Sequence, residues 1–313
     1  MAKVVFMGTP DFAVPSLEAL CAHHQVVLVV TRPDRKQGRG RKLCSPPVKD
    51  VALRRGLQVW QPRTLRTPQA VERLRETHAD VYVTAAIGLI LPPDVLALSP
   101  HGCINVHASL LPRWRGAAPI SAAILHGDSE TGITLMQTDK GLDTGPILAQ
   151  VRCAIQPDDT RETLTRRLAQ LGADLLIETL PRWLSDEITP QPQPQEGITF
   201  SKRLAKGDGR IDWLEPAVHI EHSVRAYTPW PGAFSFYRGR SLKILRAQAL
   251  PDWRGTELPG EVIALPGGRV AVVAGRGALV LSEIQLAGRR ATSPDAFCRG
   301  YRDFVGSKLG QAE

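Results

Sequence analysis

The sequence predicts an α/β protein, with a doubly wound, mainly parallel, Rossmann-like sheet followed by a small OB-like C-terminal β-barrel. In the first half, short apolar strands alternate with helical patterns, which is typical of parallel sheets with crossover helices. In the second half, short strands follow one another closely and are separated by Gly and Pro turns, as in small antiparallel barrels. The length of 313 residues suits two domains, each with its own core.

The elements of the first half follow from their apolar patterns. Short apolar runs bounded by turns predict strands at residues 4–7, 26–30, 57–59, 81–83, 103–107, 133–137 and 147–151. A helical pattern covers residues 12–21, and further helix-like segments lie between the strands. The leucines at 164, 168, 171 and 175 share one face of a long amphipathic helix predicted over residues 160–183.

A Pro/Gln-rich stretch at residues 189–195 marks the predicted domain boundary, because alternating Pro and Gln favour an extended, semi-rigid spacer. The sequence therefore predicts a first domain over residues 1–188, a linker over 189–207 and a barrel domain over 208–313. Strands of the barrel are predicted at residues 233–237, 242–245, 261–265, 269–273 and 279–282, and a final helix at 294–304.

The composition narrows the class of protein. A formal net charge of +8 favours a polyanionic partner. The five cysteines are odd in number and scattered, so neither a disulfide framework nor a zinc site is expected. The chain starts directly in a strand without a signal peptide, and its most apolar stretch, residues 81–98, is broken by two prolines and an Asp. We therefore expect a cytoplasmic protein that does not contact a membrane and binds no metal.

Polar side chains gather at the end of the predicted strand 103–107. Residues two apart on a strand share a face, so Asn105 and His107 point the same way. Ligand sites of α/β sheets lie at the carboxyl ends of the strands. Asp143, in a Gly-rich loop between two later strands, can reach the same place. An amide donor, an imidazole and a carboxylate are suited to acyl transfer.

The surrounding string is long enough to compare with known families. Residues 105–116 (NVHASLLPRWRG), followed by residues 141–145 (GLDTG), resemble the formyltetrahydrofolate-dependent formyltransferases. Residues 7–12 (MGTPDF) are also similar to the opening of this family, whereas the single Gly8 argues against a dinucleotide-binding fingerprint. The resemblance covers nearly the whole chain and is strongest over residues 1–185.

The resemblance implies an enzyme that moves the formyl group of 10-formyltetrahydrofolate, its co-substrate, to the α-amino group of methionine on initiator methionyl-tRNA. It assigns catalysis to Asn105, His107 and Asp143. It also implies a folate pocket lined by Ile87, Gly88, Leu89, Ile90, Ser109, Leu110, Leu111, Pro112 and Gly141. The chain departs from the family at Ile87, where Tyr is common. We expect a monomer.

A basic loop is predicted over residues 31–43, after the second strand. Its cationic side chains are Arg35, Lys36, Arg39, Arg41 and Lys42. A cationic loop at the carboxyl edge of the sheet suits a phosphate backbone lying across the entrance of the site. It resembles the inserted loop with which members of the family that act on initiator tRNA hold its acceptor end.

Other interpretations remain open at this point. The nearest is a folate-dependent formyltransferase for an amino sugar nucleotide or a purine precursor, which the basic loop disfavours. A hydrolase using Ser109, His107 and Asp143 is disfavoured because no G-x-S-x-G elbow surrounds the serine. A non-catalytic RNA-binding adaptor would have no use for the three candidate catalytic residues.

Overall fold

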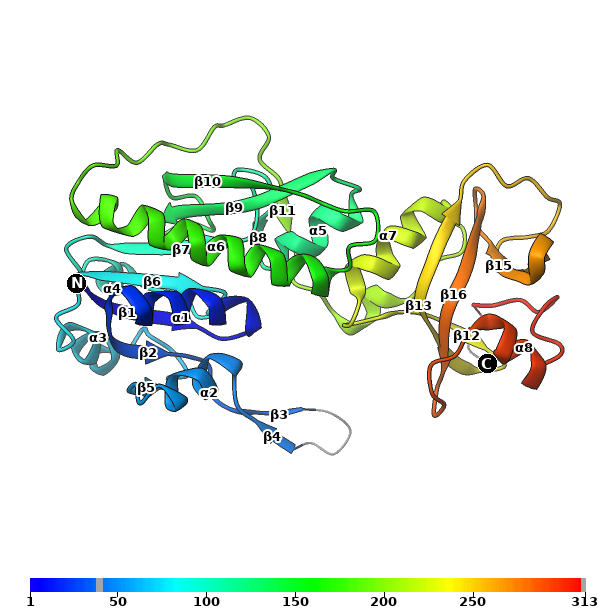
Figure 1. The fold of residues 1–313 in the computed structure, drawn as a ribbon, viewed down its shortest axis with the longest axis horizontal. Coiled ribbons are helices and arrows are strands. Elements are labelled where there is room, and N and C mark those ends of the chain that lie inside the picture. Colours follow the sequence, from blue (N-terminus) through cyan, green and yellow to red (C-terminus); the bar gives the residue numbers. More distant parts are fainter. Residues whose placement is uncertain (38–41, 311–313) are drawn as a thin grey trace. The chain divides into compact units, whose positions relative to one another are not determined.

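The computed structural model describes residues 1–37 and 42–310, without the side chains of Gln37 and Lys42 (Figure 1). The chain divides into two compact units. The first unit consists of Met1–Pro119, Glu130–Ala154 and Thr165–Ser201, and the second of Ile120–Ser129, Ile155–Leu164 and Lys202–Glu313.

This division departs from the predicted domain boundaries. Residues 120–129 and 155–164 belong to the second unit, and the Pro/Gln-rich segment belongs to the first. The segment is not a free spacer, because the backbone of Gln191 forms an antiparallel bridge with Ile147. Hydrogen bonding to the sheet therefore overrides the extended-linker tendency of the composition.

A seven-stranded sheet forms the centre of the first unit, in the order β10-β9-β7-β6-β1-β2-β5. Its strands are β1 (Lys3–Gly8), β2 (Gln25–Val30), β5 (Val59–Trp60), β6 (Val81–Ala85), β7 (Cys103–His107), β9 (Glu130–Gln137) and β10 (Ile147–Ala154). The strands from β7 to β5 are parallel, while β9 and β10 are antiparallel to their neighbours. The predicted mainly parallel sheet is confirmed, and the carboxyl ends of β1, β6 and β7 meet at one edge.

Helices cover both faces of this sheet. They are η1 (Asp11–Ala13), α1 (Val14–His23), α2 (Pro47–Arg54), α3 (Pro68–Arg75), α4 (Pro93–Leu96) and α6 (Arg161–Leu184). Val5 of β1 lies in one buried cluster with Leu74 of α3 and Val95 of α4. On the other face, which bears α1 and α6 in front of the sheet in Figure 1, an added Cβ at Gly172 would lie 2.9 Å from Val106. The long helix α6 therefore packs closely against β7.

Two short pairings lie beside the main sheet. β3 (Arg35–Gln37) pairs antiparallel with β4 (Lys42–Cys44), so part of the predicted basic loop is a hairpin. β8 (Arg115–Gly116) pairs in parallel with β11 (Phe200–Ser201). A Cβ at Gly116 would lie 2.4 Å from the Ser201 carbonyl oxygen, and its φ is +111°, so this pairing requires a glycine.

The second unit contains one five-stranded antiparallel sheet, in the order β12-β13-β16-β15-β14. Its elements are α5 (Pro119–Leu125), η2 (Lys206–Gly209), α7 (Ala217–Tyr227), β12 (Ala233–Tyr237), β13 (Arg240–Leu250), β14 (Val262–Leu265), η3 (Pro266–Gly268), β15 (Arg269–Val273), β16 (Ala278–Leu286) and α8 (Pro294–Gly300). In the described residues β12 and β14 are not paired with each other, so the sheet is open and the predicted OB-like barrel is not confirmed.

Helix α7, which was not predicted from the sequence, explains the open sheet. Ile220 and Val224 of α7 share a buried cluster with Leu242 and Leu279 of the sheet, and Phe297 of α8 joins them. The apolar face of the sheet is therefore covered by helices rather than closed upon itself. No helix among the described residues is both long and apolar enough to span a bilayer.

Candidate active site

Asn105 and His107 lie on the same face of β7 at its carboxyl end, as predicted from their spacing. The Asn105 side chain is oriented by a neighbour on β6, because the Thr84 hydroxyl donates to its Oδ1 at 2.9 Å. Its Nδ2 therefore points away from Thr84 and donates a long hydrogen bond of 3.5 Å to Oδ1 of Asp143. The second N–H of this amide can serve an oxygen of a bound molecule.

The His107 ring is 6% exposed and is held by one backbone contact. Its Nε2 lies 3.1 Å from the Trp114 carbonyl oxygen. A carbonyl can only accept, so in the neutral imidazole the proton sits on Nε2 and Nδ1 carries the lone pair. Nδ1 in turn lies 3.7 Å from Oδ2 of Asp143. A proton taken up at Nδ1 would therefore face a carboxylate.

Asp143 completes the cluster from the loop between β9 and β10. Its Oδ2 accepts a hydrogen bond of 2.8 Å from the backbone N–H of Gly116. Its φ is +52°, a left-handed conformation that costs about 1–2 kcal/mol for most L-residues and less for Asp. The loop also passes very close to the sheet, since a Cβ at Gly145 would lie 1.8 Å from the Gln137 carbonyl oxygen. Packing and hydrogen bonds thus impose the conformation that brings the carboxylate to His107.

The structure therefore brings the three predicted catalytic residues together. The Asn105 amide can donate to a developing oxyanion, and the His107 imidazole can hold a proton beside the Asp143 carboxylate. Such a constellation at the carboxyl edge of a mainly parallel sheet can polarise a carbonyl and take a proton from an attacking nucleophile.

The predicted folate-pocket residues 87–90 form the turn after β6. Ile87 is buried in the core cluster beside α3 and α4, and its carbonyl accepts from the Thr9 hydroxyl at 3.0 Å. Gly88 has a φ of +66°, and its carbonyl oxygen accepts a hydrogen bond from Arg32. Ile90 is exposed. The Ile87 side chain thus packs the core, and a ligand here would meet backbone groups and the exposed residues.

The second predicted group, residues 109–112, follows β7. Ser109 is fully buried and its hydroxyl donates to the Arg113 carbonyl at 2.6 Å. The Ser109 hydroxyl therefore stabilises the turn of residues 109–113. Ser109 can affect a bound ligand only through the conformation of this turn. The Leu111 N–H donates to the Thr134 hydroxyl at 3.0 Å. Gly141 lies in the exposed Asp143 loop, where its N–H donates to Asp139 at 3.0 Å.

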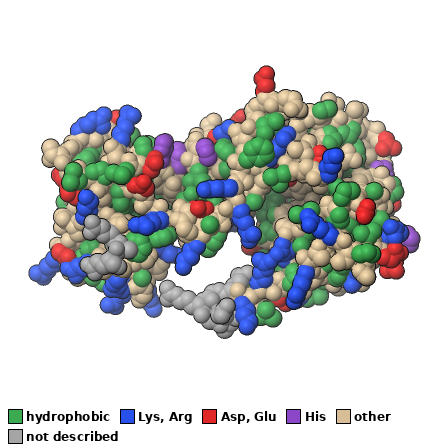
Figure 2. Space-filling view, turned by 180° about the vertical axis from the view of Figure 1, so that it is seen from behind, with side chains coloured by type: hydrophobic (Ala, Val, Ile, Leu, Met, Phe, Trp, Pro, Cys, Tyr) green, Lys and Arg blue, Asp and Glu red, His purple; other side chains and the backbone are tan. Residues whose placement is uncertain are grey.

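Two of the predicted tRNA-binding residues are described in full. Arg35 and Lys36 are exposed on β3. Arg39 and Arg41 lie outside the described residues, and only the backbone of Lys42 is described. The base of the hairpin is held by Asp34, whose carboxylate accepts from Gln61 at 2.7 Å and pairs with Lys49 at 2.7 Å. These hydrogen bonds lower the pKa of Asp34. In Figure 2, Lys and Arg side chains are more frequent on the visible face than Asp and Glu side chains.

Three supporting groups were not predicted from the sequence. Thr84 orients Asn105, the Gly116 N–H binds Asp143, and Gln193 bonds to the carbonyls of the Asp143 loop. A buried Thr on a strand and a Gln in a low-complexity segment carry no local pattern that marks a site. Only the tertiary pairing reveals them.

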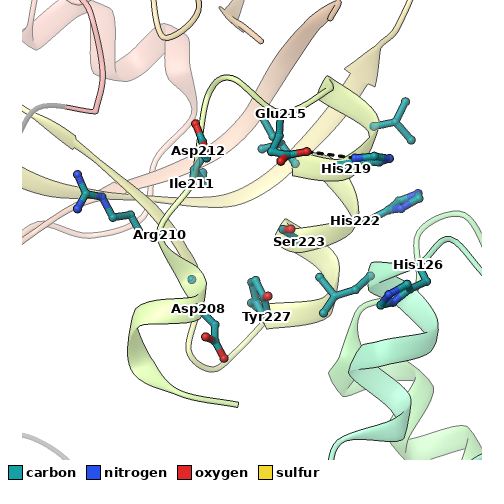
Figure 3. A pocket seen from close by; sticks show the side chains of 14 residues that line it. His126, Asp208, Arg210, Ile211, Asp212, Glu215, His219, His222, Ser223 and Tyr227 are labelled. Atoms are coloured by element: carbon teal, nitrogen blue, oxygen red, sulfur yellow. Dashed lines mark hydrogen bonds and ion pairs between the residues drawn. The ribbon is translucent and has the colours of Figure 1, made fainter. Parts of the chain in front are cut away.

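A separate hollow of about 500 Å³ lies within the second unit, between α5, α7 and the segment before α7 (Figure 3). His126, His219 and His222 line it together with Asp208 and other residues, and Nδ1 of His219 lies 3.3 Å from Glu215. None of the predicted site residues lines this hollow. Among the described residues, no group of three or more His, Cys, Asp or Glu side chains could hold a metal ion.

The fold and the site define an α/β group-transfer enzyme, and comparison with known proteins identifies its family. Residues 2–180 match the model of the formyl transferase family, and residues 203–302 match that of the formyl transferase C-terminal domain. The chain belongs to the formyl transferase family.

Its curated relatives are similar over nearly their whole length. It is 50% identical to the methionyl-tRNA formyltransferase of Myxococcus xanthus, covering 98% of this chain and 97% of the relative. It is 48% identical to the methionyl-tRNA formyltransferase of Thiobacillus denitrificans, covering 98% and 99%. Among solved structures, it matches an N-formyltransferase from Helicobacter canadensis, in complex with folinic acid and dTDP-3-aminofucose, with a TM-score of 0.66. That match is 18% identical, covers 90% of this chain and 99% of that one, and shows the shared fold.

Proposed function

We propose that the protein transfers the formyl group of 10-formyltetrahydrofolate to the α-amino group of methionine on initiator methionyl-tRNA, for translation initiation. The observation that carries this proposal is the similarity to methionyl-tRNA formyltransferases at about half of all positions across both units. The similarity covers 98% of this chain and therefore extends over both units. The acceptor also suits a chain with a formal net charge of +8.

Asn105 supports the chemical step of this reaction. Attack of a neutral amine on the formyl carbon gives a tetrahedral intermediate that carries an oxyanion. One well-placed donor to such an oxygen is worth about 2.7–4 kcal/mol of the barrier. The Asn105 amide is suited to this role because the Thr84 hydroxyl at 2.9 Å fixes which end of the amide carries the N–H groups.

His107 and Asp143 handle the proton of the amine in this proposal. The attacking nitrogen becomes positively charged as the new C–N bond forms, so it must lose a proton before the intermediate collapses. Nδ1 of His107 accepts that proton, and the imidazolium then forms an ion pair with Asp143, whose Oδ2 is 3.7 Å away. The same proton can return to N10 of the leaving tetrahydrofolate, which balances the transfer.

The folate and the tRNA approach the site from the carboxyl edge of the sheet. We assign the folate to the turns that follow β6 and β7, residues 87–90 and 109–112, together with Gly141. We assign the phosphates of the acceptor end to the basic loop, residues 31–43, with Arg35, Lys36, Arg39, Arg41 and Lys42. We assign the second unit to the rest of the tRNA. We also propose that the enzyme acts in the cytoplasm, where initiator tRNA is used, and that it acts as a monomer.

The test is an acceptor assay with the purified protein. The protein is mixed with 10-formyltetrahydrofolate and, in parallel, with initiator methionyl-tRNA, elongator methionyl-tRNA or an amino sugar nucleotide. We expect formylmethionyl-tRNA from the initiator tRNA and little product from the other acceptors. Preferential formylation of the amino sugar nucleotide would refute the proposal. The basic loop would then be a solvated surface segment without a tRNA-binding role.

A further inference from the structure

Gln193 differs from its neighbours in the Pro/Gln-rich segment. It is 6% exposed, whereas Gln191 and Gln195 of the same segment are exposed. A polar side chain that is buried in an otherwise exposed segment needs hydrogen-bond partners. Gln193 has them in the first unit, directly behind the candidate active site.

The Gln193 amide is fully occupied. Its Nε2 donates to the carbonyl oxygens of Asp143 and Gly145, each at 2.8 Å. Its Oε1 accepts from Nε and Nη2 of Arg115 at 3.1 and 2.7 Å. A glutamine amide has two N–H donors and two lone pairs on its oxygen, so all four positions are used. Two carbonyls on one side and a guanidinium on the other allow one orientation of the amide.

These contacts connect the Asp143 loop to the segment around Arg115. Asp143 and Gly145 belong to the loop that carries the carboxylate, which has a φ of +52° at Asp143. Arg115 is 7% exposed and lies between Trp114 and Gly116 in the sequence. The Trp114 carbonyl contacts His107, and the Gly116 N–H binds Asp143. Gln193 therefore fixes the Asp143 loop against the short strand β8.

We propose that Gln193 is a positioning residue for formyl transfer: it holds the Asp143 carboxylate at His107 through the loop backbone and touches no reacting atom. This inference rests on the proposed function of Asp143. The N–H groups of Gln193 position the Asp143 loop, because they bind its carbonyls. The oxygen of Gln193 fixes the orientation of the amide by accepting from Arg115.

Two substitutions separate these contributions. Gln193→Leu removes all four hydrogen bonds, and Gln193→Glu retains an acceptor for Arg115 but cannot donate to the two carbonyls. Because a displacement of about 1 Å in an active site can cost about 10²-fold, we expect both variants to lower kcat by roughly 10- to 100-fold. The KM for 10-formyltetrahydrofolate should change little. Gln195→Leu, an exposed position in the same segment, is the matched control and should retain full kcat.

A double-mutant cycle with Asp143→Asn tests whether the effect passes through Asp143. We expect Gln193→Leu to cost little further kcat in the Asp143→Asn background, because coupled residues are non-additive. An equal fold-loss in both backgrounds would show a merely structural role and overturn the proposal, as would near-normal kcat in Gln193→Leu.

Backbone amide exchange over residues 141–145 gives a readout that is independent of activity. We expect faster exchange in the folded Gln193→Leu protein than in the wild type or in Gln195→Leu. Unchanged exchange would overturn the positioning role. If the wild type formylates no methionyl-tRNA while the exchange responds as expected, the positioning of the loop stands and the proposed function is what fails.

Discussion

Oδ2 of Asp143 lies 3.7 Å from Nδ1 of His107, beyond hydrogen-bonding distance, while the Gly116 N–H binds that same oxygen at 2.8 Å. The carboxylate is thus held beside the imidazole by a third group. Since Nε2 of His107 faces a carbonyl, a proton can be gained only at Nδ1, next to the carboxylate. The pair is arranged to stabilise an imidazolium that forms during the reaction.

Asp143→Asn tests this arrangement. The asparagine can still accept from the Gly116 N–H, but it carries no charge to stabilise the imidazolium. We expect kcat to fall by roughly 10²-fold or more, as for other groups that assist proton transfer. Asp186 is also left-handed, with a φ of +58°, but is exposed elsewhere, so Asp186→Asn is the matched control. Steady-state kinetics should show full activity in the control; equal losses in both would contradict the assignment.

His24 gives the stability of the protein a dependence on pH. It is 8% exposed and neither ring nitrogen has a hydrogen-bond partner among the described residues. Burial, together with the N-terminal amine and His23, lowers its pKa below the usual 6.5. The unfolded state then binds a proton that the folded state does not, so the contribution of His24 is fully present above about 6.5 and is lost as pH falls below it.

His24→Phe should remove this contribution. We expect the free energy of unfolding in urea to fall less between pH 7.5 and 5.5 for His24→Phe than for the wild type. His23→Phe, at the adjacent exposed position, removes only the smallest of these three influences on His24, so most of the wild-type pH dependence should remain. Parallel pH profiles for the wild type and His24→Phe would show that His24 does not titrate in this way.

The residues that sequence reasoning placed correctly are those with local patterns. Alternation along β7 predicted the shared face of Asn105 and His107, because strand geometry has a fixed period. The role of Gln193 could not be predicted, since its partners are the carbonyls of residues about 50 positions away and its own segment resembles a spacer. The open second sheet escaped prediction for a similar reason: helix α7, overlooked in the sequence, covers the face that a barrel would close.

Removal of metal ions should leave the enzyme active. The proposed chemistry uses an amide donor and an imidazole, and no cluster of three ligand side chains occurs in the part of the chain that the structure describes. We expect formyl transfer after exhaustive EDTA treatment and dialysis to match the untreated rate. A reproducible loss that zinc restores would reveal a metal site.

The basic loop, residues 31–43, should set the salt dependence of tRNA binding. Removing one cationic side chain that neutralises a phosphate should reduce the slope of log K against log salt by about 0.7–0.9. We therefore expect Arg35→Ala/Lys36→Ala, and separately Arg39→Ala/Arg41→Ala/Lys42→Ala, to raise KM for methionyl-tRNA and to flatten its salt dependence. Affinity for 10-formyltetrahydrofolate should hardly change.

The matched control for the variants of the basic loop removes positive charge at the opposite edge of the sheet. Arg75 is next to Leu74, whose carbonyl accepts a hydrogen bond from Tyr82 near the start of β6. Arg182 is next to Trp183, which donates to the His101 carbonyl just before β7. Both arginines are therefore near the amino ends of the strands. Arg75→Ala/Arg182→Ala should leave the slope unchanged. Variants of the basic loop with wild-type kinetics across the salt series would show that the loop does not contact the tRNA.

The central claim is that Asn105 stabilises the oxyanion of the formyl group and that His107 takes the proton of the attacking amine. Single-turnover formylation of methionyl-tRNA tests this claim most directly. Enzyme in excess, saturated with 10-formyltetrahydrofolate, is mixed with the tRNA, so that product release does not limit the observed rate. We predict that Asn105→Ala and His107→Ala each lower this rate by roughly 10²-fold or more, with binding of both substrates and the melting temperature retained. A near-normal single-turnover rate in either folded variant would contradict the account.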